Sequence, residues 1–327
     1  MLRAKIIGTG SYTPEKILTN QDLEKMVDTS DEWIKSRTGI TERRVVVKGQ
    51  VTSDLCVASA KNALEMAGIG PDDIDLLLIG TVTPDFKLPS LACIVQKKLG
   101  LKNAATMDIV AACSGFIYGL SIARAHIISG IYKNIMVIGA EMLSSVTNYE
   151  DRNTCVLFGD AAGAAILTAT EEDTGILSTF MKSDGNLAEL LCIPAGGTQN
   201  PFSRNGDTPW SDYFIQMRGN EVFKHAVRHM GNAAERVISD AGLTHDQIDW
   251  LIPHQANIRI IKATADRIGL PMEKVFMNIE KYGNTSAASV PLALDEAIRT
   301  GLIKTGDNIV SVAFGGGLTW GAVLFRW

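Results

Sequence analysis

The chain lacks the features that mark several large classes of protein. Its 327 residues carry 36 acidic and 31 basic side chains, and the formal net charge of −5 argues against nucleic-acid binding through overall charge. Its five cysteines are odd in number, widely spaced and never arranged as CxxC, so neither a disulfide framework nor a thiolate zinc site is expected. A reducing, cytoplasmic location fits these cysteines best.

No targeting or membrane-spanning segment is expected either. The N-terminal stretch MLRAKIIGTGSYTP has too short an apolar run for a signal peptide and is typical of a first strand. One uncharged run, 308–325, approaches the length of a membrane span, but the glycines at its centre make it a poor helix. A buried strand, a glycine turn and a second strand are predicted there instead.

The composition is that of an ordinary globular protein. Hydrophobic residues make up 46% of the chain and charged residues 20%, which suits one large or two medium domains with a full core. Nucleotide signatures are weak, because no GxxxxGK[ST] motif occurs and the stretch 8–10 lacks the third glycine of a dinucleotide fingerprint.

The chain also repeats itself. AGIGPDDIDLLLIGT at 67–81 resembles AGLTHDQIDWLIPHQ at 241–255, and NIMVIGA at 134–140 resembles NIVSVAF at 308–314, in both cases 174 positions later. The repeated unit is typical of a helix end, a polar turn and a buried strand. Two similar α/β halves are therefore predicted, with apolar strands covered on both faces by helices.

These halves are expected to span 1–172 and 173–327. Counting back from the ends of the last long helix in each half gives an offset of 171 and places Cys113 opposite Asn284, each on a turn that leads into a helix. His254 is expected at the carboxyl end of a buried strand, where open α/β sheets bind ligands. The repeat therefore predicts that Cys113, His254 and Asn284 meet in one central cleft.

Cys113 is the first candidate nucleophile. It stands in IVAACSGFIYGL between a strand-like run and an apolar helix, whose expected buried face carries positions 113, 116, 117, 120, 123 and 127. A helix N-terminus favours thiolate over thiol, so this cysteine is expected to react fastest with iodoacetamide at neutral pH. The alternative is a free cysteine that merely packs in the core.

His254 and Asn284 could work with such a thiolate. His254 follows the run IDWLI, whereas the other four histidines lie on expected helices or a polar turn. Cysteine, histidine and asparagine together could support acyl transfer, and the backbone of glycines 315–317 could supply a further donor to an oxyanion. The alternative for His254 is a histidine that caps a strand. The alternative for the glycines is a simple tight turn between two strands.

These motifs together resemble one family. AACSGF around Cys113, PHQAN around His254, YGNTSAAS around Asn284 and the terminal FGGGLTWG closely resemble β-ketoacyl-acyl carrier protein synthase III, a thiolase-fold condensing enzyme. The resemblance runs almost end to end, from IIGTGSYTP through LFGDAAGAAIL to Trp327. Elongating relatives use two histidines and thiolases a second cysteine, so Asn284 favours the initiating enzyme. An αβαβα layered fold with two pseudo-symmetric halves is implied.

The resemblance implies a two-step reaction at these residues. Cys113 takes the acyl group of a short acyl-CoA, with acetyl-CoA as the expected starter, and malonyl-acyl carrier protein then loses carbon dioxide and condenses with it. His254 and Asn284 hold the enolate oxygen, while the N–H groups of Cys113 and Gly316 hold the acyl oxyanion. No metal and no bound organic cofactor is implied.

Binding roles also follow from the resemblance. The residues for CoA are Trp33 and Arg152 at the adenine, Arg37 at a phosphate and Asn257 beside the pantetheine. The residues for the acyl pocket or channel are Phe158, Met217 and Phe314, with Leu88 reaching across a homodimer interface into the partner's pocket. The residues for a basic carrier-protein patch are Lys224, Arg228, Arg259, Lys262 and Arg267. Ordinary solvated or core residues are the alternative at each of these positions, and the dimer edge is expected within 93–110.

Two other functions remain open at this point. A related initiating synthase that makes a specialised ketide or quinolone would share the cysteine, the histidine and the asparagine. A non-catalytic homologue that binds acyl-CoA or carrier protein belongs to a different class, against which the presence of all three residues argues. The identity of the starter acyl group is left undetermined.

Overall fold

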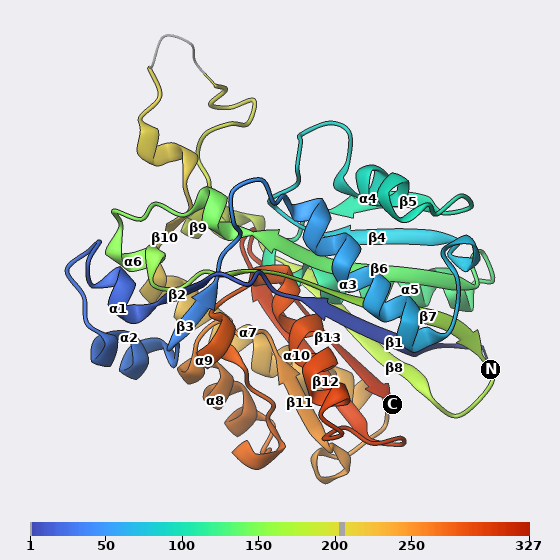
Figure 1. Cartoon of the computed structure of the whole chain (residues 1–327). Helices are drawn as coiled ribbons and strands as arrows, with labels where there is room; N and C mark the ends of the chain where they lie inside the picture. Colours follow the sequence, from blue (N-terminus) through green and yellow to red (C-terminus); the bar gives the residue numbers. More distant parts are fainter. Residues whose placement is uncertain (1, 203–206) are drawn as a thin grey trace.

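The computed structural model describes residues 2–202 and 207–327 and contains two main β-sheets (Figure 1). The first sheet has the order β1-β7-β6-β4-β5. Its strands are β1 (Arg3–Tyr12), β4 (Leu76–Gly80), β5 (Ala105–Ile109), β6 (Asn134–Met142) and β7 (Asp160–Thr170). β4 runs parallel to β5 and β6, whereas β7 is antiparallel to both β6 and β1.

The second sheet has the order β11-β12-β13-β8 and is built from the later part of the chain. Its strands are β8 (Gly175–Ser183), β11 (Trp250–Pro253), β12 (Asn308–Gly315) and β13 (Thr319–Arg326). β11 and β12 are parallel, and the other pairs are antiparallel. The prediction of two strands joined by a glycine turn within 308–325 is confirmed, as is the N-terminal strand.

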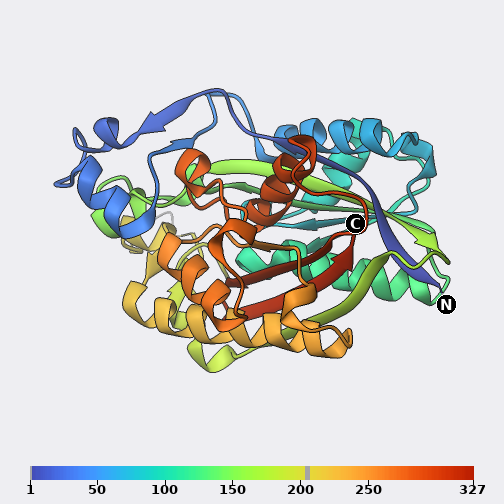
Figure 2. The same cartoon turned by 90° about the horizontal axis from the view of Figure 1, so that it is seen from below.

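The helices form three layers around the two sheets, so the molecule is the predicted αβαβα stack (Figure 2). One pair covers the outer face of the first sheet, a central pair lies between the sheets, and a third covers the outer face of the second sheet. In that order the pairs are α3 (Thr52–Ala67) with α4 (Leu91–Leu99), α5 (Gly115–Ile128) with α10 (Ser289–Arg299), and α7 (Gly219–Asp240) with α8 (Ile258–Arg267).

Short elements connect these layers. Two small sheets pair β2 (Ile17–Thr19) with β3 (Glu42–Arg44) and β9 (Leu191–Cys192) with β10 (Gln216–Met217). The short helices are α1 (Asn20–Leu23), α2 (Asp31–Thr38), α6 (Arg152–Cys155) and α9 (Ile279–Tyr282). The 3-10 turns are η1 (Pro71–Asp73), η2 (Ala112–Ser114), η3 (Leu143–Val146), η4 (Gly185–Leu190), η5 (Trp210–Tyr213), η6 (His245–Gln247), η7 (Met272–Lys274) and η8 (Ser286–Ala288).

Burial explains why the apolar runs form these elements. All five residues of β4 are buried, because helices cover both faces of the sheet that contains it. The predicted inner face of α5 is also confirmed, since Phe116, Ile117, Leu120 and Ala123 are fully buried in the central core. No helix among the described residues is long and apolar enough to cross a membrane.

The internal repeat is visible in matched hydrogen bonds. The Asn134 N–H donates to the Asp75 carboxylate at 2.9 Å, and the Asn308 N–H donates to the Asp249 carboxylate at the same distance. Each asparagine also donates from Nδ2 to a backbone carbonyl in the turn before the neighbouring strand. The residues of the second pair lie 174 positions after those of the first. The two halves therefore join the starts of their parallel strands by the same hydrogen bonds. The division at 172 and 173 stays a prediction.

The predicted match between Cys113 and Asn284 is wrong. The helices α5 and α10 begin at Gly115 and Ser289, again 174 positions apart, so Cys113 corresponds to Ala287. α5 has 14 residues and α10 only 11, so counting back from the helix ends introduced an error of three positions. Asn284 lies three positions earlier, two residues before the turn η8 begins.

Close backbone contact holds the turn η8 against the first sheet. A Cβ atom at Gly139 in β6 would collide with the carbonyl oxygen of Ala287 and would lie 3.2 Å from Cβ of Phe116. We expect Gly139→Ala to lower the free energy of unfolding by ~1–3 kcal/mol, because neither neighbour can move without shifting a packed helix. Gly185→Ala is the matched control, since a Cβ there meets nothing within 4 Å. Urea unfolding of the whole chain measures both, and equal stability of the two variants would contradict the packing argument.

Candidate active site

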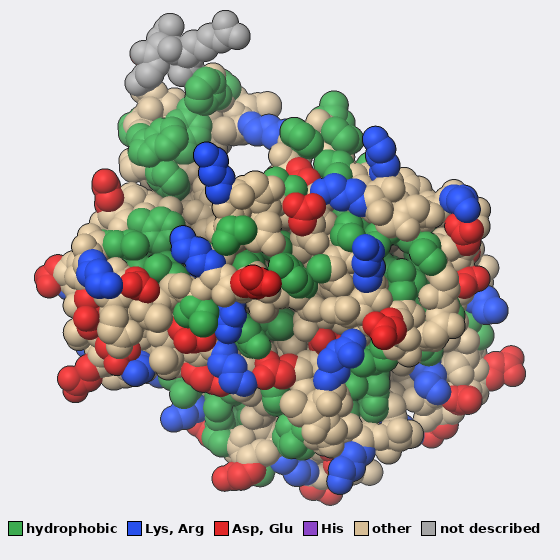
Figure 3. Space-filling view, viewed as in Figure 1, with side chains coloured by type: hydrophobic (Ala, Val, Ile, Leu, Met, Phe, Trp, Pro, Cys, Tyr) green, Lys and Arg blue, Asp and Glu red, His purple; other side chains and the backbone are tan. Residues whose placement is uncertain are grey.

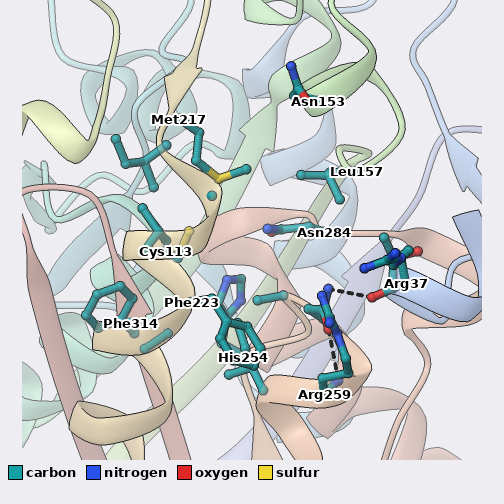
Figure 4. Close-up of a pocket in the computed structure, with 18 of the residues that line it drawn as sticks. Arg37, Cys113, Asn153, Leu157, Met217, Phe223, His254, Arg259, Asn284 and Phe314 are labelled. Carbon is teal, nitrogen blue, oxygen red and sulfur yellow. Dashed lines mark hydrogen bonds between the residues drawn. The ribbon is translucent and has the colours of Figure 1, made fainter.

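One cavity of about 400 Å³ opens where the carboxyl ends of β11 and β12 meet the turn η2 and the segment before η8. Cys113, His254 and Asn284 all line it, although they come from three separate segments (Figure 4). The predicted convergence of these three residues in one cleft is therefore what the structure contains. The thiol and the carboxamide both face the centre of the close-up, with the imidazole beneath them.

Cys113 is the middle residue of the turn η2 and lies two positions before Gly115, the first residue of α5. The preceding residue, Ala112, has a φ of +46°, a left-handed conformation that non-glycine residues rarely adopt. Hydrogen bonds from β13 support this turn: the Thr319 hydroxyl donates to the Ala111 carbonyl at 2.8 Å, and the Ser114 hydroxyl donates to the Thr319 carbonyl at 3.1 Å. Hydrogen bonds to β13 therefore fix the turn that carries the thiol at both of its ends.

The expectation of a ready-made thiolate at Cys113 is wrong for the free protein. Burial raises the pKa of this thiol to about 12, against smaller lowering effects of hydrogen bonds from the Ser286 side chain and its own backbone. The charge of Glu141 raises the pKa further. Removal of the thiol from water therefore outweighs the favourable helix N-terminus, and the resting group is a thiol.

His254 follows β11 directly and is held in one orientation. Its backbone N–H donates to the Val312 carbonyl at 2.8 Å, and its Nδ1 lies 2.6 Å from the Ser289 hydroxyl. The Gln255 N–H donates to that hydroxyl oxygen at 3.4 Å, which leaves the Ser289 O–H free to donate to Nδ1. Burial lowers the pKa of His254 to about 3, so the imidazole is neutral at pH 7.

Asn284 is fixed by its backbone and by its own side chain. Its N–H donates to the Leu157 carbonyl at 2.8 Å, and its carbonyl accepts from the Gly159 N–H at 3.0 Å. The Oδ1 atom accepts the Ser286 N–H at 2.9 Å. Among the described residues Nδ2 has no hydrogen-bond partner, so the carboxamide keeps its donor for a bound molecule.

The glycine run after β12 packs against the cysteine turn. A Cβ atom at Gly315 would lie 2.6 Å from the backbone nitrogen of Cys113, so only glycine permits this approach. Gly316 lies next in the chain, and a Cβ there would be 3.7 Å from Cβ of Ala112. Two backbone segments that could donate N–H groups therefore lie side by side at the thiol.

The residues predicted to bind CoA lie near the mouth of the cavity. Trp33 and Arg37 project from α2 one helical turn apart, and the Arg152 guanidinium stacks on the Trp33 ring at 4.5 Å from its centroid. Asn257 donates to the Arg37 carbonyl at 2.9 Å and caps α8 by accepting from the Arg259 N–H. Trp33, Arg37 and Asn257 line the cavity, while Arg152 reaches it through its contact with Trp33.

The predicted acyl-pocket residues divide into two groups. Phe158, Met217 and Phe314 line the cavity from three different segments. Leu88 does not, because it stands on an outer loop with 87% of its surface exposed. This exposure suits a residue whose partner lies in another chain.

The five basic residues predicted to bind carrier protein are all exposed on α7 and α8. Arg259 also lines the cavity and lies 5.2 Å over the Phe223 ring. Arg267 differs from the rest, since its guanidinium pairs with Glu235 at 3.0 Å and is partly neutralised.

Three residues beside the site escaped the sequence analysis. Ser289 orients His254, while Ser286 donates from its backbone N–H to Asn284 and from its hydroxyl to the carboxylate of Glu141. Glu141 is fully buried at the end of β6. A carboxylate that directly follows the apolar run 135–140 was the available signal, because such a position is at the carboxyl edge of a buried strand.

Comparison with known proteins identifies the class. Family models described as 3-Oxoacyl-[acyl-carrier-protein (ACP)] synthase III and its C-terminal part match residues 107–185 and 238–327. The crystal structure of 3-oxoacyl-[acyl-carrier-protein] synthase III from Aquifex aeolicus superposes with a TM-score of 0.92 at 50% identity and covers 99% of this chain and 100% of that one. The fold is therefore that of the thiolase-like condensing enzymes.

Full-length relatives narrow the class further. The β-ketoacyl-[acyl-carrier-protein] synthase III of Caldanaerobacter subterraneus is 55% identical over 100% of this chain and 98% of its own. The priming β-ketosynthase from the R1128 polyketide pathway has a TM-score of 0.92 at only 34% identity, over 99% of this chain and 96% of that one. The chain belongs to the β-ketoacyl-acyl carrier protein synthase III family of condensing acyltransferases.

The cysteine environments predict an order of alkylation. Cys93 is exposed, and hydrogen bonds from Ser90 and Thr106 lower the pKa of its thiol, whereas burial raises that of Cys113. We therefore expect iodoacetamide at pH 7 to label Cys93 before Cys113, which corrects the earlier expectation. Peptide mass spectrometry over time measures the order, and faster labelling of Cys113 would show that its thiolate is stabilised beyond the contacts described here.

Proposed function

We propose that this chain condenses a short acyl-CoA with malonyl-acyl carrier protein through an acyl-enzyme on Cys113. Acetyl-CoA is the expected starter. The observation that carries the proposal is the presence of one thiol, one neutral imidazole and one free carboxamide donor in a single cavity. Membership of the β-ketoacyl-acyl carrier protein synthase III family supports the same reaction.

The first step transfers the acyl group to the protein. The CoA adenine binds between Trp33 and Arg152, where it replaces the direct stacking of the guanidinium on the ring. Arg37 contacts a phosphate, and the pantetheine passes Asn257 toward the thiol. The cavity extends from Trp33 and Arg37 to Cys113, which supports this path. Cys113 Sγ attacks the thioester carbonyl carbon, and CoA departs as the thiolate.

Backbone donors stabilise the oxyanion of that step. The N–H groups of Cys113 and Gly316 hold the carbonyl oxygen of the acyl group, and the close packing of the glycine run on the cysteine turn supports this assignment. Such donors are effective because they are fixed before the charge develops.

The second step generates the carbanion. Malonyl-acyl carrier protein loses carbon dioxide, and the thioester oxygen becomes an enolate that accepts from His254 Nε2–H and Asn284 Nδ2–H. The contacts of Ser289 with His254 Nδ1 and of Ser286 N–H with Asn284 Oδ1 support these roles, since each leaves the opposite nitrogen as a donor. The carbanion then attacks the acyl-enzyme and releases the β-ketoacyl product.

The remaining predicted residues are assigned to the acyl channel, to the contact with a second copy and to the contact with carrier protein. Phe158, Met217 and Phe314 form apolar walls for the acyl chain, and Leu88 of a second copy closes the pocket. The carrier protein is acidic and docks on Lys224, Arg228, Arg259, Lys262 and Arg267. A local field of this kind reconciles an acidic chain with an acidic partner, although the pairing of Arg267 with Glu235 makes it the weakest member.

A homodimer is the proposed assembly. β5 is an edge strand of the first sheet, so one row of its backbone groups is unpaired within the chain. Large apolar side chains are exposed beside it at Phe86, Leu88 and Val110, and Figure 3 shows hydrophobic surface on the protruding loops. A second copy that pairs edge to edge would cover both features.

Location and cofactor use remain part of this proposal. All five cysteines are free, which supports a cytoplasmic protein. The two substrates and the side chains of the cavity supply every group that the reaction needs, so we propose that no metal or organic cofactor takes part.

Two alternative functions have less support. A synthase for a specialised ketide would have the same three residues, but the identity to the R1128 priming enzyme is 34%, against 55% to the synthase III of Caldanaerobacter subterraneus. A non-catalytic binding homologue has no need of a cysteine, an imidazole and a carboxamide with free donors.

The second step can be separated from the first by mutation. We expect His254→Ala and Asn284→Ala each to slow decarboxylation of malonyl-acyl carrier protein ~10²- to 10³-fold, because each removes one donor to the enolate. Acylation of Cys113 should be affected much less, as measured by transfer of radiolabel from acetyl-CoA. The roles are misassigned if both variants lose acylation and retain release of carbon dioxide.

The dimer can be tested at the strand edge. We expect a dimeric mass at micromolar concentration and a larger monomer fraction for Met107→Arg, because Met107 lies in β5 and is 44% exposed within one chain. Ile128→Arg is the control, since Ile128 is 42% exposed at the end of α5. Light scattering gives both masses, and a fully active monomer of the unmodified protein would refute the proposal.

A further inference from the structure

Arg43 is a buried cation that the proposed reaction does not use. It is the middle residue of β3, and its surface is 0% exposed. Glu42, the carboxylate next to it in the chain, lies 3.7 Å from the Arg44 guanidinium instead. Burial lowers the pKa of Arg43 to about 10, so its guanidinium is still charged at pH 7. A buried charge is costly unless its surroundings hold it, so its hydrogen bonds show what the position is built for.

Neutral oxygen atoms take the place of a carboxylate partner. Nη1 of Arg43 donates to the Leu18 carbonyl at 3.3 Å and to Asn20 Oδ1 at 2.9 Å. Nη2 donates to the Val156 carbonyl at 2.6 Å. Hydrogen bonds from a charged donor are roughly twice as strong as neutral ones, and the planar guanidinium sets their directions. Arg43 therefore joins the start of α1 rigidly to the segment that begins at Val156.

This segment, 156–159, is the one that holds Asn284. Phe158 and Asn284 form an isolated parallel β-bridge. The Asn284 N–H donates to the Leu157 carbonyl at 2.8 Å, and the Asn284 carbonyl accepts from the Gly159 N–H at 3.0 Å. The carbonyl that Arg43 holds is therefore the one directly before the first of these two contacts.

The stem of Arg43 packs against both sides of the bridge. A Cβ added at Gly159 would lie 3.2 Å from Cβ of Arg43, and a Cβ added at Gly283 would lie 3.3 Å from the same atom. Gly283 directly precedes Asn284 and has a φ of +64°, a conformation that favours glycine. Both chain segments that place the Asn284 backbone thus contact one side chain.

The other end of the guanidinium is anchored by a second buried side chain. Asn20 is 0% exposed and donates from Nδ2 to the Asp31 carboxylate and to the Ile40 carbonyl, both at 2.9 Å. Asp31 is the first residue of α2, and Ile40 follows that helix closely in the chain. Arg43 can hold the segment 156–159 because it is itself held by this framework.

We propose that Arg43 positions the Asn284 carboxamide for the decarboxylation step. The inference rests on the proposed function, in which Asn284 Nδ2 donates to the enolate oxygen. Arg43 does not contact the reacting atoms and acts through the segment 156–159, so it is a positioning residue. A donor of this kind works only if it is already in place as charge develops, and a displacement of ~1 Å can cost ~10² in rate.

The alternative is a buried arginine that contributes only to the stability of the fold. The two roles differ once the Asn284 carboxamide has been removed. If Arg43 acts through that carboxamide, loss of Arg43 has little left to impair. If Arg43 acts independently of it, the two losses multiply in the rate.

The experiment is a double-mutant cycle on the whole chain. Release of carbon dioxide from malonyl-acyl carrier protein is measured for the unmodified protein, Arg43→Met, Asn284→Ala and the double variant. Acetylation of Cys113 by acetyl-CoA is followed in the same preparations. We expect Arg43→Met to slow decarboxylation ~10²-fold and acetylation much less. In the Asn284→Ala background, Arg43→Met should change decarboxylation by only ~2-fold or less.

Two further variants serve as controls. Arg44→Met removes the neighbouring cation of the same strand, which is only partly buried, and should leave both rates unchanged. His254→Ala is the second background, because His254 is held by Val312 and Ser289 rather than by the segment 156–159. Arg43→Met should still slow decarboxylation ~10²-fold in that background, which shows that a slower rate can be measured.

Amide hydrogen exchange provides a readout that does not depend on activity. We expect faster exchange in Arg43→Met at the N–H groups of Asn284 and Gly159, and unchanged protection in β6, as measured by peptide mass spectrometry. If Arg43→Met does not fold, Arg43→Lys goes through the same cycle with a smaller effect. Lysine keeps the charge, but its single ammonium group cannot reproduce the two-sided fork.

The outcomes separate this inference from the proposed function. Equal slowing by Arg43→Met with and without the Asn284 carboxamide would overturn the inference. Equal slowing of acetylation and decarboxylation, loss of the effect in the His254→Ala background, or unchanged exchange at Asn284 would also overturn it. Undiminished decarboxylation by Asn284→Ala alone would instead contradict the role of Asn284 in the proposed function. The exchange rates would then decide whether Arg43 holds the segment.

Discussion

The site depends on the close approach of two helix-entry turns to the first sheet and to each other. Gly80 at the end of β4 lies so near Gly115 that a Cβ on either residue would come within 3 Å of the other's backbone. Gly139 contacts the turn η8 in the same manner, and the turns themselves pass through left-handed residues at Ala112 and Ser286. Because packed backbones cannot slide past one another, this contact fixes the positions of the thiol, the carboxamide and the Ser286 hydroxyl together.

Burial gives the same site its electrostatic character. The Cys113 thiol is protonated, the His254 imidazole is neutral, and the pKa of the Glu141 carboxyl lies near neutrality, in each case chiefly because the group is removed from water. At the inner end of the cavity the thiol and the imidazole are therefore uncharged at pH 7. Oriented donors act more strongly in such surroundings, since charge develops on the substrate only during the reaction.

Much of this arrangement could be predicted from the sequence. Apolar runs with helix or strand periodicity predicted strands covered on both faces by helices, the inner face of α5 and the place of His254 after β11, because local pattern and burial agree there. The order of the five layers came from the family resemblance. The alignment of Cys113 with Asn284 failed because α5 is three residues longer than α10, a difference that no local pattern reports.

The pKa values of the site residues could not be predicted from the sequence, for a physical reason. A helix N-terminus at Cys113 suggested a thiolate, yet the pKa depends on the depth of burial, which only the packed structure supplies. Glu141 offered only its place after an apolar run as a signal, and its complete burial is known only from the packed structure. Its contact with Ser286 joins positions 145 residues apart in the sequence.

The most direct test of the account is the mass of the protein after incubation with acetyl-CoA alone. We expect one acetyl group per chain, located by peptide mapping on the segment that contains Cys113 and absent from Cys113→Ala. Single substitutions of Cys56, Cys93, Cys155 and Cys192 should each leave that acetyl group in place. An acetyl group on another residue, or condensation without any acylated protein, would contradict the account.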